Sequence, residues 1–531
     1  MKNKRNYRNL WLVLLLLPAT GQATEARRLT YGETAKPATR DPYTGHEASA
    51  ARMADLLFNS LTTTTSSGKR IPGLASHWTV ESNGTSVLFK LRRDVYWHPP
   101  AGSSKPTHKL SADDVATTVR IIKAKGSQIP NQERFQAIAA TEVVDPHTVR
   151  IRLARAMTDP LRVMGFKILP AHILASTPAL RRDSKFASMP VGTGPYRLLK
   201  VNDHGEVVLE AFNRYFAGKP TIPTIVMKSY ADQSVMAQSL MFNSLDLITW
   251  VSPRDLSEIM GDRNLGVIPY DALSFSFFAM NTSRGILGDK RVRRAISHSV
   301  NRQEMLNAFF QGKGSLISGP FPPTSWAYNL NVTPVSYDPA RAAKLFAEAG
   351  LSHKGGKLLD KTGKPVRIVF AVPLSGESEM IKRISLAFQG YLQKAGIAVE
   401  LQFMDWNVWK NRVLRDHDYD VTIASWSFDD ASNITSLFHS SSAKPWGNNF
   451  VLYRNTQVDS LLTEAASTND FEKRRVIYKK LHAMLADEAP YTFLWTLMHH
   501  AAHNMKVSGV KVEPWSFFRH VATWQIKDKP R

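Results

Sequence analysis

The sequence contains no cysteine in its 531 residues, so it forms no disulfide and has no thiol to carry a lipid. After residue 23, no stretch is long and apolar enough to span a bilayer, which takes about 20 residues. The patterns HExxH, GxSxG and GxxxxGKS/T are also absent. These absences argue against a membrane-spanning protein and against the common hydrolases and nucleotide-binding enzymes.

The first 23 residues have the form of a secretory signal. Four basic residues precede the apolar run 10–17, and Gly21 and Ala23 are small residues at the positions that a signal peptidase reads. The run is too short for a membrane anchor. We therefore expect cleavage after Ala23 and a soluble mature protein in the periplasm, which is not a lipoprotein because it lacks cysteine.

Basic residues outnumber acidic residues by 68 to 45, which gives a formal charge of +23, or +19 without the four basic residues of the signal. Such an excess is common in proteins that bind nucleic acid or anionic surfaces. Here the basic residues are scattered, with short clusters such as Arg291, Arg293 and Arg294 and no long basic block. We expect a solvated basic surface, suited to anionic lipid headgroups, and no nucleic acid partner.

The length and the pattern of hydrophobic residues predict several α/β domains. The chain is too long for one hydrophobic core, and strand-like and helix-like stretches alternate without a long linker. The clearest unit is a strand at 365–372, an amphipathic helix at 378–396 that Gly396 ends, and a strand at 397–404. A second unit of this kind covers residues 207–243.

Residues 423–435 read IASWSFDDASNIT, a strand-like run followed by two aromatic residues and two adjacent aspartates. In open α/β sheets, ligands bind outside the carboxyl ends of the strands, so this position is a candidate binding site. Adjacent residues of an extended chain face opposite sides, so at most one aspartate faces a ligand. DHDYD at 416–420 and the pair His499–His500 lack the spacing of metal ligands. We expect no metal, no cofactor and no catalytic residue.

Separated blocks of sequence carry a resemblance to a known family. In chain order, they are RIPGLASHW (70–78), LFKLRRDVYWH (88–98), LSADDV (110–115), VGTGPYRL (191–198), MNTSRGILGDKRVRRAISHSVNR (280–302), YDVTIASWSFDD (419–430), GNNFVLYRNTQVDSLLTEA (447–465) and DEAPYTFLW (487–495). In this order and spacing, the blocks resemble the extracellular solute-binding proteins of the peptide and nickel class, family 5. These proteins are the receptor subunits of ABC importers.

The resemblance implies an α/β fold, the two-lobed periplasmic-binding-protein clamp of type II, cluster C, with an additional inserted subdomain. The first lobe would combine residues 24–57, 190–272 and 502–531. The inserted subdomain would span 58–189, and the second lobe 273–501. Hinge closure would enclose a ligand between the lobes.

The resemblance also implies a ligand anchor. In peptide-binding relatives, an aspartate that follows a tryptophan and two small residues binds the α-ammonium group of the ligand, and Asp429 matches this position after Trp426. A carboxylate in a closed cleft needs a partner, and a charged hydrogen bond is about twice as strong as a neutral one. Trp426 and Phe428 would form apolar walls or belong to the core. The alternative for Asp429 is an acidic turn residue.

Four other residues are weaker candidates for ligand contacts. Asn449 matches a position near the cleft in relatives, and a turn role suits it equally. Lys382 or Arg383 resembles the basic residue that holds a peptide carboxylate, although a solvated helix face is favoured. Trp406 would line the pocket or pack in the core, and the core is slightly favoured.

The function that the resemblance implies is a monomeric periplasmic receptor, not an enzyme. It would capture short peptides, or peptide-like ligands with a free amine, and deliver them to the permease of an ABC importer. The alternatives are a metal chelate, haem, an opine, an oligosaccharide or a cationic antimicrobial peptide in the same role, and at lower weight a secreted hydrolase. Residues 423–425 lack the histidine that nickel-chelate binders can use before the tryptophan, which weighs against nickel.

Overall fold

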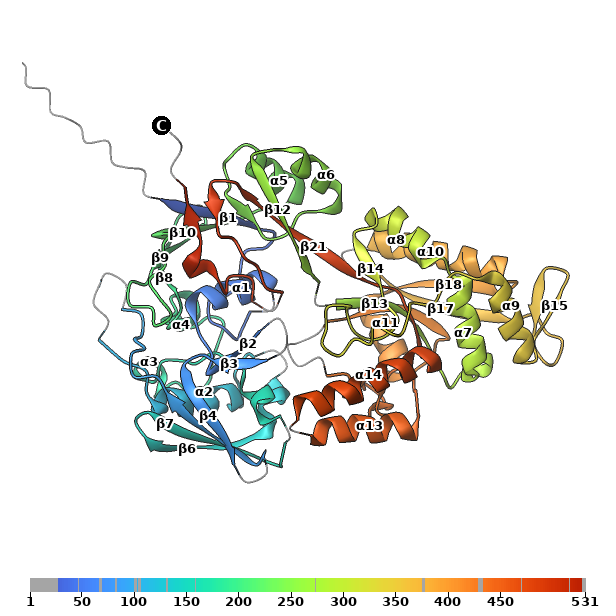
Figure 1. Ribbon diagram of the computed structural model, residues 1–531, viewed down its shortest axis with the longest axis horizontal. Helices are drawn as coiled ribbons and strands as arrows, with labels where there is room; N and C mark the ends of the chain where they lie inside the picture. The colour runs from blue at the N-terminus through green and yellow to red at the C-terminus, as the bar shows by residue number, and fades with distance from the viewer. Residues whose placement is uncertain are drawn as a thin grey trace, which may run out of the picture.

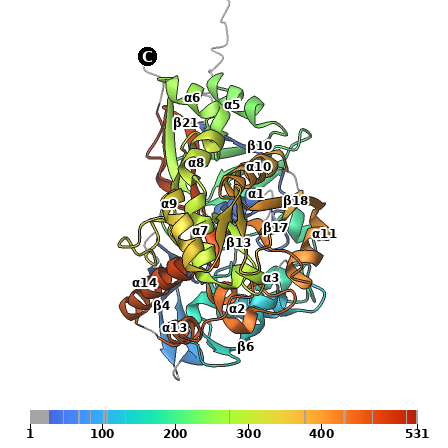
Figure 2. The same ribbon diagram turned by 90° about the vertical axis from the view of Figure 1, so that its right-hand side faces the viewer.

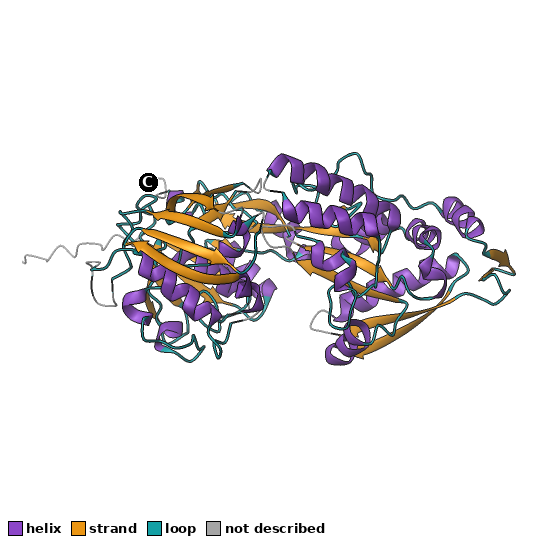
Figure 3. Cartoon of the chain, turned by 90° about the horizontal axis from the view of Figure 1, so that it is seen from below, coloured by secondary structure: helices purple, strands orange, loops and turns teal. Residues whose placement is uncertain are grey.

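The chain forms two bodies that are joined by a long strand, β21 (Trp495–Asn504), which runs from one body to the other (Figure 1). A computed structural model describes residues 27–527 except 46, 66–68, 82–83, 100–102, 104–106, 130–131, 158, 273, 375–377, 428–432, 469 and 515. Both ends of the described chain lie in the first body, while residues 274–493, apart from the short strand β14 (Gly314–Leu316), build the second. Seen from below, the two bodies lie end to end (Figure 3).

The first body is organised around an eight-stranded sheet with the order β12-β21-β11-β1-β10-β9-β8, to which β14 is attached through β21. The strands other than β21 are β1 (Arg28–Glu33), β8 (Tyr196–Val201), β9 (Val207–Ala211), β10 (Thr224–Ser229), β11 (Leu247–Ile248), β12 (Leu265–Asp271) and β14 (Gly314–Leu316). The helices are α1 (Ala48–Leu57), α5 (Gln233–Met241) and α6 (Pro253–Gly261). Strands β1, β10 and β11 run parallel, so their carboxyl ends lie at one edge.

A smaller sheet lies between α1 and β8 in the sequence, in the segment expected as the inserted subdomain. Its four antiparallel strands have the order β4-β5-β7-β6, and α2 packs against β6. The elements are β2 (Thr62–Thr64), β3 (Arg70–Pro72), β4 (Ala75–Glu81), β5 (Ser86–Leu91), α2 (Ala112–Lys123), β6 (Ile138–Asp145), β7 (Thr148–Leu153), a 3-10 turn (Pro160–Met164), α3 (Ala171–Leu174) and α4 (Lys185–Ser188). Helix α2 begins at a capping box in which the Ser111 backbone N–H donates to the Asp114 carboxylate at 2.8 Å.

The second body contains a five-stranded sheet with the order β18-β17-β19-β13-β20. Its strands are β13 (Ser274–Met280), β17 (Arg367–Leu374), β18 (Ala398–Asp405), β19 (Val421–Ser427) and β20 (Tyr491–Phe493), and a hairpin of β15 (Ser352–Lys354) and β16 (Lys357–Leu359) lies apart. Its helices are α7 (Lys290–Ser299), α8 (Arg302–Phe310), α9 (Pro339–Glu348), α10 (Ser378–Lys394), α11 (Trp406–Trp409), α12 (Thr435–Phe438), α13 (Thr456–Ser467) and α14 (Phe471–Glu488). The β17–α10–β18 unit is the strand–helix–strand unit that the sequence predicted.

Helices α13 and α14 form a hairpin that lies beside the inserted subdomain in two perpendicular views (Figures 1 and 2). The Asp470 carboxylate caps α14 by accepting hydrogen bonds from the backbone N–H groups of Glu472 and Lys473. The helix ends where Ala489 adopts a left-handed conformation (φ 46°) before Pro490. Both ends of the longer helix of the hairpin are therefore defined locally.

Two arginines are buried in the second body, which corrects one expectation. Arg293, expected on the solvated surface, is only 3% exposed, and its guanidinium donates to the carbonyl oxygens of Leu287, Gly288, Glu488 and Ala489. The sequence did not reveal this burial, because the other two members of the cluster, Arg291 and Arg294, lie at the surface and are paired with acidic residues.

The second buried cation is Arg302, also 3% exposed. Its guanidinium donates to the carbonyl oxygens of Ile317, Val335 and Phe493. Burial lowers the pKa of Arg302 to about 10, which still leaves the side chain charged at neutral pH. Three chain segments of the second body are thus tied together by one side chain.

The VGTGPY segment forms the junction between the inserted subdomain and the first sheet. A Cβ atom on Gly192 would lie 1.8 Å from the carbonyl oxygen of Leu57, at the end of α1, so only glycine fits this approach. His98 is 3% exposed; its Nδ1 accepts a hydrogen bond from the Gly192 N–H at 3.2 Å, and its Nε2 lies 3.0 Å from the carbonyl oxygen of Gly194. The glycines thus serve packing and backbone pairing.

Candidate functional site

Three parallel strands of the second sheet end at a common edge. β17 pairs in parallel with both β18 and β19, so Leu374, Asp405 and Ser427 mark the same side of the sheet. The loops at the carboxyl ends of such strands are where open α/β sheets bind ligands. Phe428 and Asp429 follow Ser427 in sequence and lie outside the described residues.

Trp426 is half-buried near the end of β19. Its indole Nε1 donates to the hydroxyl of Tyr491 at 3.2 Å, and its ring stacks on Phe277 with centroids 6.4 Å apart. Burial raises the pKa of Tyr491, so this hydroxyl stays protonated. Trp426 therefore packs partly in the aromatic core and leaves part of its surface at the edge of the sheet.

The other candidates from the sequence occupy three different surroundings. Trp406 follows β18 and is 44% exposed, stacked on Trp409 at 4.9 Å, so it is not a core residue. Lys382 lies 4.0 Å from Glu379 on the same helix, and the guanidinium of Arg383 lies 5.5 Å from the ring centre of Phe309. These contacts of α10 favour a solvated helix face for both basic residues.

Asn449 is fully buried, and its side chain is already engaged by the backbone. Its amide nitrogen donates to the carbonyl oxygens of His439 and Tyr453, and its amide oxygen accepts from the Tyr453 N–H at 3.0 Å. This placement favours the turn role over a ligand contact.

The first sheet carries an ion pair with a buried carboxylate at the carboxyl edge of its parallel strands. Glu33, the last residue of β1, is fully buried and receives two hydrogen bonds from Arg52, at 2.7 and 2.5 Å. Burial opposes the charge on Arg52, but the hydrogen bond and the attraction of Glu33 outweigh it and raise the arginine pKa. Sequence reasoning missed this pair because its partners are separated by 19 residues and neither belongs to a recognised motif.

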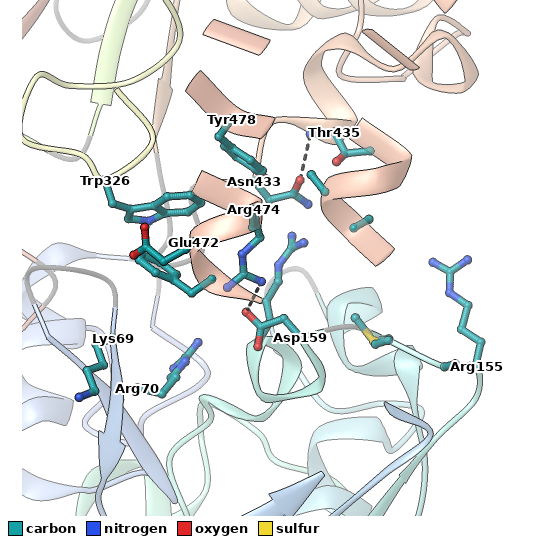
Figure 4. A pocket seen from close by; sticks show the side chains of 16 residues that line it. Lys69, Arg70, Arg155, Asp159, Trp326, Asn433, Thr435, Glu472, Arg474 and Tyr478 are labelled. Carbon is teal, nitrogen blue, oxygen red and sulfur yellow. Dashed lines mark hydrogen bonds and ion pairs between the residues drawn. The ribbon is translucent and has the colours of Figure 1, made fainter. Parts of the chain in front are cut away.

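A cavity of about 810 Å³ lies between the inserted subdomain and the α13–α14 hairpin (Figure 4). The residues that line it are Lys69, Arg70, Arg155, Ala156, Met157, Asp159, Arg162, Trp326, Asn433, Thr435, Ala465, Ala466, Phe471, Glu472, Arg474 and Tyr478. Five of them are basic and two are acidic. Asn433 and Thr435 lie within eight residues of the end of β19 in the sequence.

One ion pair crosses this cavity. Arg474, on α14, lies 3.2 Å from the carboxylate of Asp159 in the inserted subdomain (Figure 4). The guanidinium also lies 5.9 Å from the ring centres of both Trp326 and Phe471, and the rings of Trp326 and Tyr478 are tilted against each other with centres 5.0 Å apart. The second body thus contributes an aromatic wall with a positive charge held against it.

Within the described residues, no cluster of three or more histidine or acidic side chains is placed to hold a metal ion. Among those same residues, no helix is both long and apolar enough to cross a membrane. The described residues offer the edge of the second sheet and a charged cavity as binding features.

Comparisons with known proteins agree with this architecture. Residues 69–448 match the family described as "Bacterial extracellular solute-binding proteins, family 5 Middle". The chain is 30% identical to Di/tripeptide-binding protein 4 of Pseudomonas aeruginosa over 543 residues, which cover 98% of this chain and 99% of the relative. It is 26% identical to the Dipeptide-binding protein of Escherichia coli over 528 residues, covering 94% and 95%.

The fold is shared with a solved structure, the oligopeptide-binding protein AppA of Bacillus subtilis in complex with a nonapeptide. The TM-score is 0.71 at 23% identity, over 94% of this chain and 99% of that one. The expected α/β clamp of two lobes with an inserted subdomain is thereby confirmed. The exact segment boundaries stay predictions, and β21 runs across the one expected between 501 and 502.

Proposed function

The chain belongs to the bacterial extracellular solute-binding proteins of family 5, and from this membership we propose that it captures short peptides between its lobes and delivers them to an ABC importer. In this proposal, the mature protein is a periplasmic monomer whose closed form the permease recognises. It binds its cargo without chemical change.

The observation that carries the proposal is full-length similarity to relatives named for dipeptides and tripeptides. The sheet edge supports it, because the ends of β17, β18 and β19 lie together beside the half-buried Trp426. A peptide presents one charged amine and a backbone of hydrogen-bonding groups. Such a ligand suits a site that anchors the amine and accepts different side chains elsewhere.

We assign the amine anchor to Asp429, the second residue after β19. A carboxylate at this sequence position would form a charge-assisted hydrogen bond with the α-ammonium group of the peptide. The proposal predicts that Asp429→Asn weakens peptide binding roughly ten- to a hundredfold, since hydrogen bonds to charged groups contribute about 1.5–3 kcal/mol.

The test measures the thermal unfolding midpoint with a pool of di- to pentapeptides and with the same pool N-acetylated. A ligand at about a hundred times its Kd adds roughly 2.7 kcal/mol to native stability. We expect a rise that acetylation abolishes, that Asp429→Asn loses and that the neighbouring control Asp430→Asn retains. No rise with either pool would count against peptides and direct the search to metal chelates or other small solutes.

A further inference from the structure

We propose that the cavity between the inserted subdomain and the α13–α14 hairpin binds a side-chain carboxylate of the ligand, so that acidic peptides are preferred cargo. This inference rests on the proposed function and adds a second charged contact to it. It is built from described residues alone, on walls contributed by both bodies.

The charge balance of the cavity favours an anion. Its two acidic residues are already engaged, Asp159 with Arg474 at 3.2 Å and Glu472 with Arg475 at 2.6 Å. Besides Arg474, four basic residues line the cavity, Lys69, Arg70, Arg155 and Arg162. Within the described part of the chain, Lys69, Arg155 and Arg162 form no ion pair. Their positive charge therefore stands uncompensated around a concave space.

The wall formed by the second body already holds a carboxylate, that of Asp159. Arg474 uses its Nη1 atom for that contact, while its buried Nε has no hydrogen-bond acceptor among the described residues. A guanidinium has five N–H donors, and a buried donor without an acceptor costs free energy. The arginine thus has donor capacity beyond the one internal contact.

The aromatic side of the cavity determines which kind of acidic group fits. Trp326, Phe471 and Tyr478 stand together, with ring centres 5.2 Å apart for the first pair and 5.0 Å for Trp326 and Tyr478. Their surface suits an apolar stem, while the basic residues opposite suit a charged tip. A glutamate side chain has this form, and a volume of about 810 Å³ accommodates it with part of the peptide backbone.

The experiment compares the affinities of Ala-Glu-Ala and Ala-Gln-Ala by isothermal titration calorimetry. We expect the purified protein to bind the glutamate peptide roughly tenfold more tightly, since a hydrogen bond to a charged group is worth about that factor or more. In the double variant Arg155→Gln and Arg162→Gln, the preference should fall to about threefold or less. The double variant Arg254→Gln and Arg263→Gln removes two exposed charges elsewhere and should keep the full preference.

These outcomes distinguish failure of the carboxylate site from failure of the proposed peptide binding. Tight and equal binding of both peptides would overturn the carboxylate site and leave peptide binding in place, whereas failure to bind either peptide would overturn both. A third measurement, with a peptide whose C-terminus is amidated, distinguishes the side-chain carboxylate from the C-terminal carboxylate. If amidating the C-terminus of Ala-Gln-Ala weakens binding to the protein but not to the Arg155 and Arg162 double variant, the cavity holds the C-terminal carboxylate, and acidic side-chain selectivity is refuted.

Discussion

The junction at His98 makes a quantitative prediction about acid stability. Burial lowers the pKa of His98 to about 4, from an ordinary value of 6.5. Its neutral ring accepts from the Gly192 N–H at Nδ1 and faces the Gly194 carbonyl with Nε2, so the tautomer with hydrogen on Nε2 satisfies both. A second proton would have to go to Nδ1, which already faces an N–H group.

The sign of the effect follows from linkage. Between pH 6.5 and about 4, the unfolded chain binds a proton at His98 and the native protein does not, so the free energy of unfolding falls as the pH falls. Each pKa unit corresponds to about 1.4 kcal/mol, so the full shift amounts to roughly 3 kcal/mol. Above pH 6.5 this contribution is fully present.

The assay is urea denaturation followed by circular dichroism at several pH values between 7 and 4.5, for the protein and for His98→Gln. Glutamine keeps a donor and an acceptor but does not titrate, and every other histidine is common to both proteins. We expect the variant to lose less stability on acidification, with the two slopes differing by up to about 1.4 kcal/mol per pH unit. Parallel curves for the two proteins would refute the tautomer and the burial argument together.

Two further substitutions test close packing and buried charge. Gly192→Ala should destabilise the protein by at least about 3 kcal/mol, because the new Cβ would lie 1.8 Å from the Leu57 carbonyl oxygen. In the same denaturation assay, the control Gly261→Ala, whose Cβ meets open space, should change stability by less than about 1 kcal/mol. Arg302→Met should lower the free energy of unfolding by about 3–5 kcal/mol, because three buried carbonyl oxygens lose their donor. A destabilisation no larger than that of the exposed control Arg254→Met would contradict this account.

The regular elements near the site were predictable because local pattern determines them. The β17–α10–β18 unit and β19 have hydrophobic periodicity and clear ends, and the structure places them within a few residues of the predicted bounds. Trp426 at the end of β19 follows from the same pattern. The resemblance extended these local elements to the whole two-lobed clamp.

The cavity and the ion pairs between distant segments were not predictable in this way. Asp159 and Arg474 are 315 residues apart, and each belongs to a residue type that is usually solvated. Arg293 lies within a basic cluster whose other members are paired with acidic residues at the surface, so composition alone could not separate it from them. Such contacts depend on how distant segments pack, which neither periodicity nor spacing encodes.

The position of β21 imposes an order on assembly. This strand lies between β12 and β11, inside the first sheet, although it follows the whole second body in the sequence. A chain that emerges from its N-terminus therefore carries an unfinished first sheet, with two unpaired strand edges, until nearly all of the polypeptide has been released. The second sheet, whose strands run in sequence from β13 to β20, is complete once residue 493 has been released. The body that begins first is thus the last to close, and a product truncated before residue 495 would expose both edges to other chains.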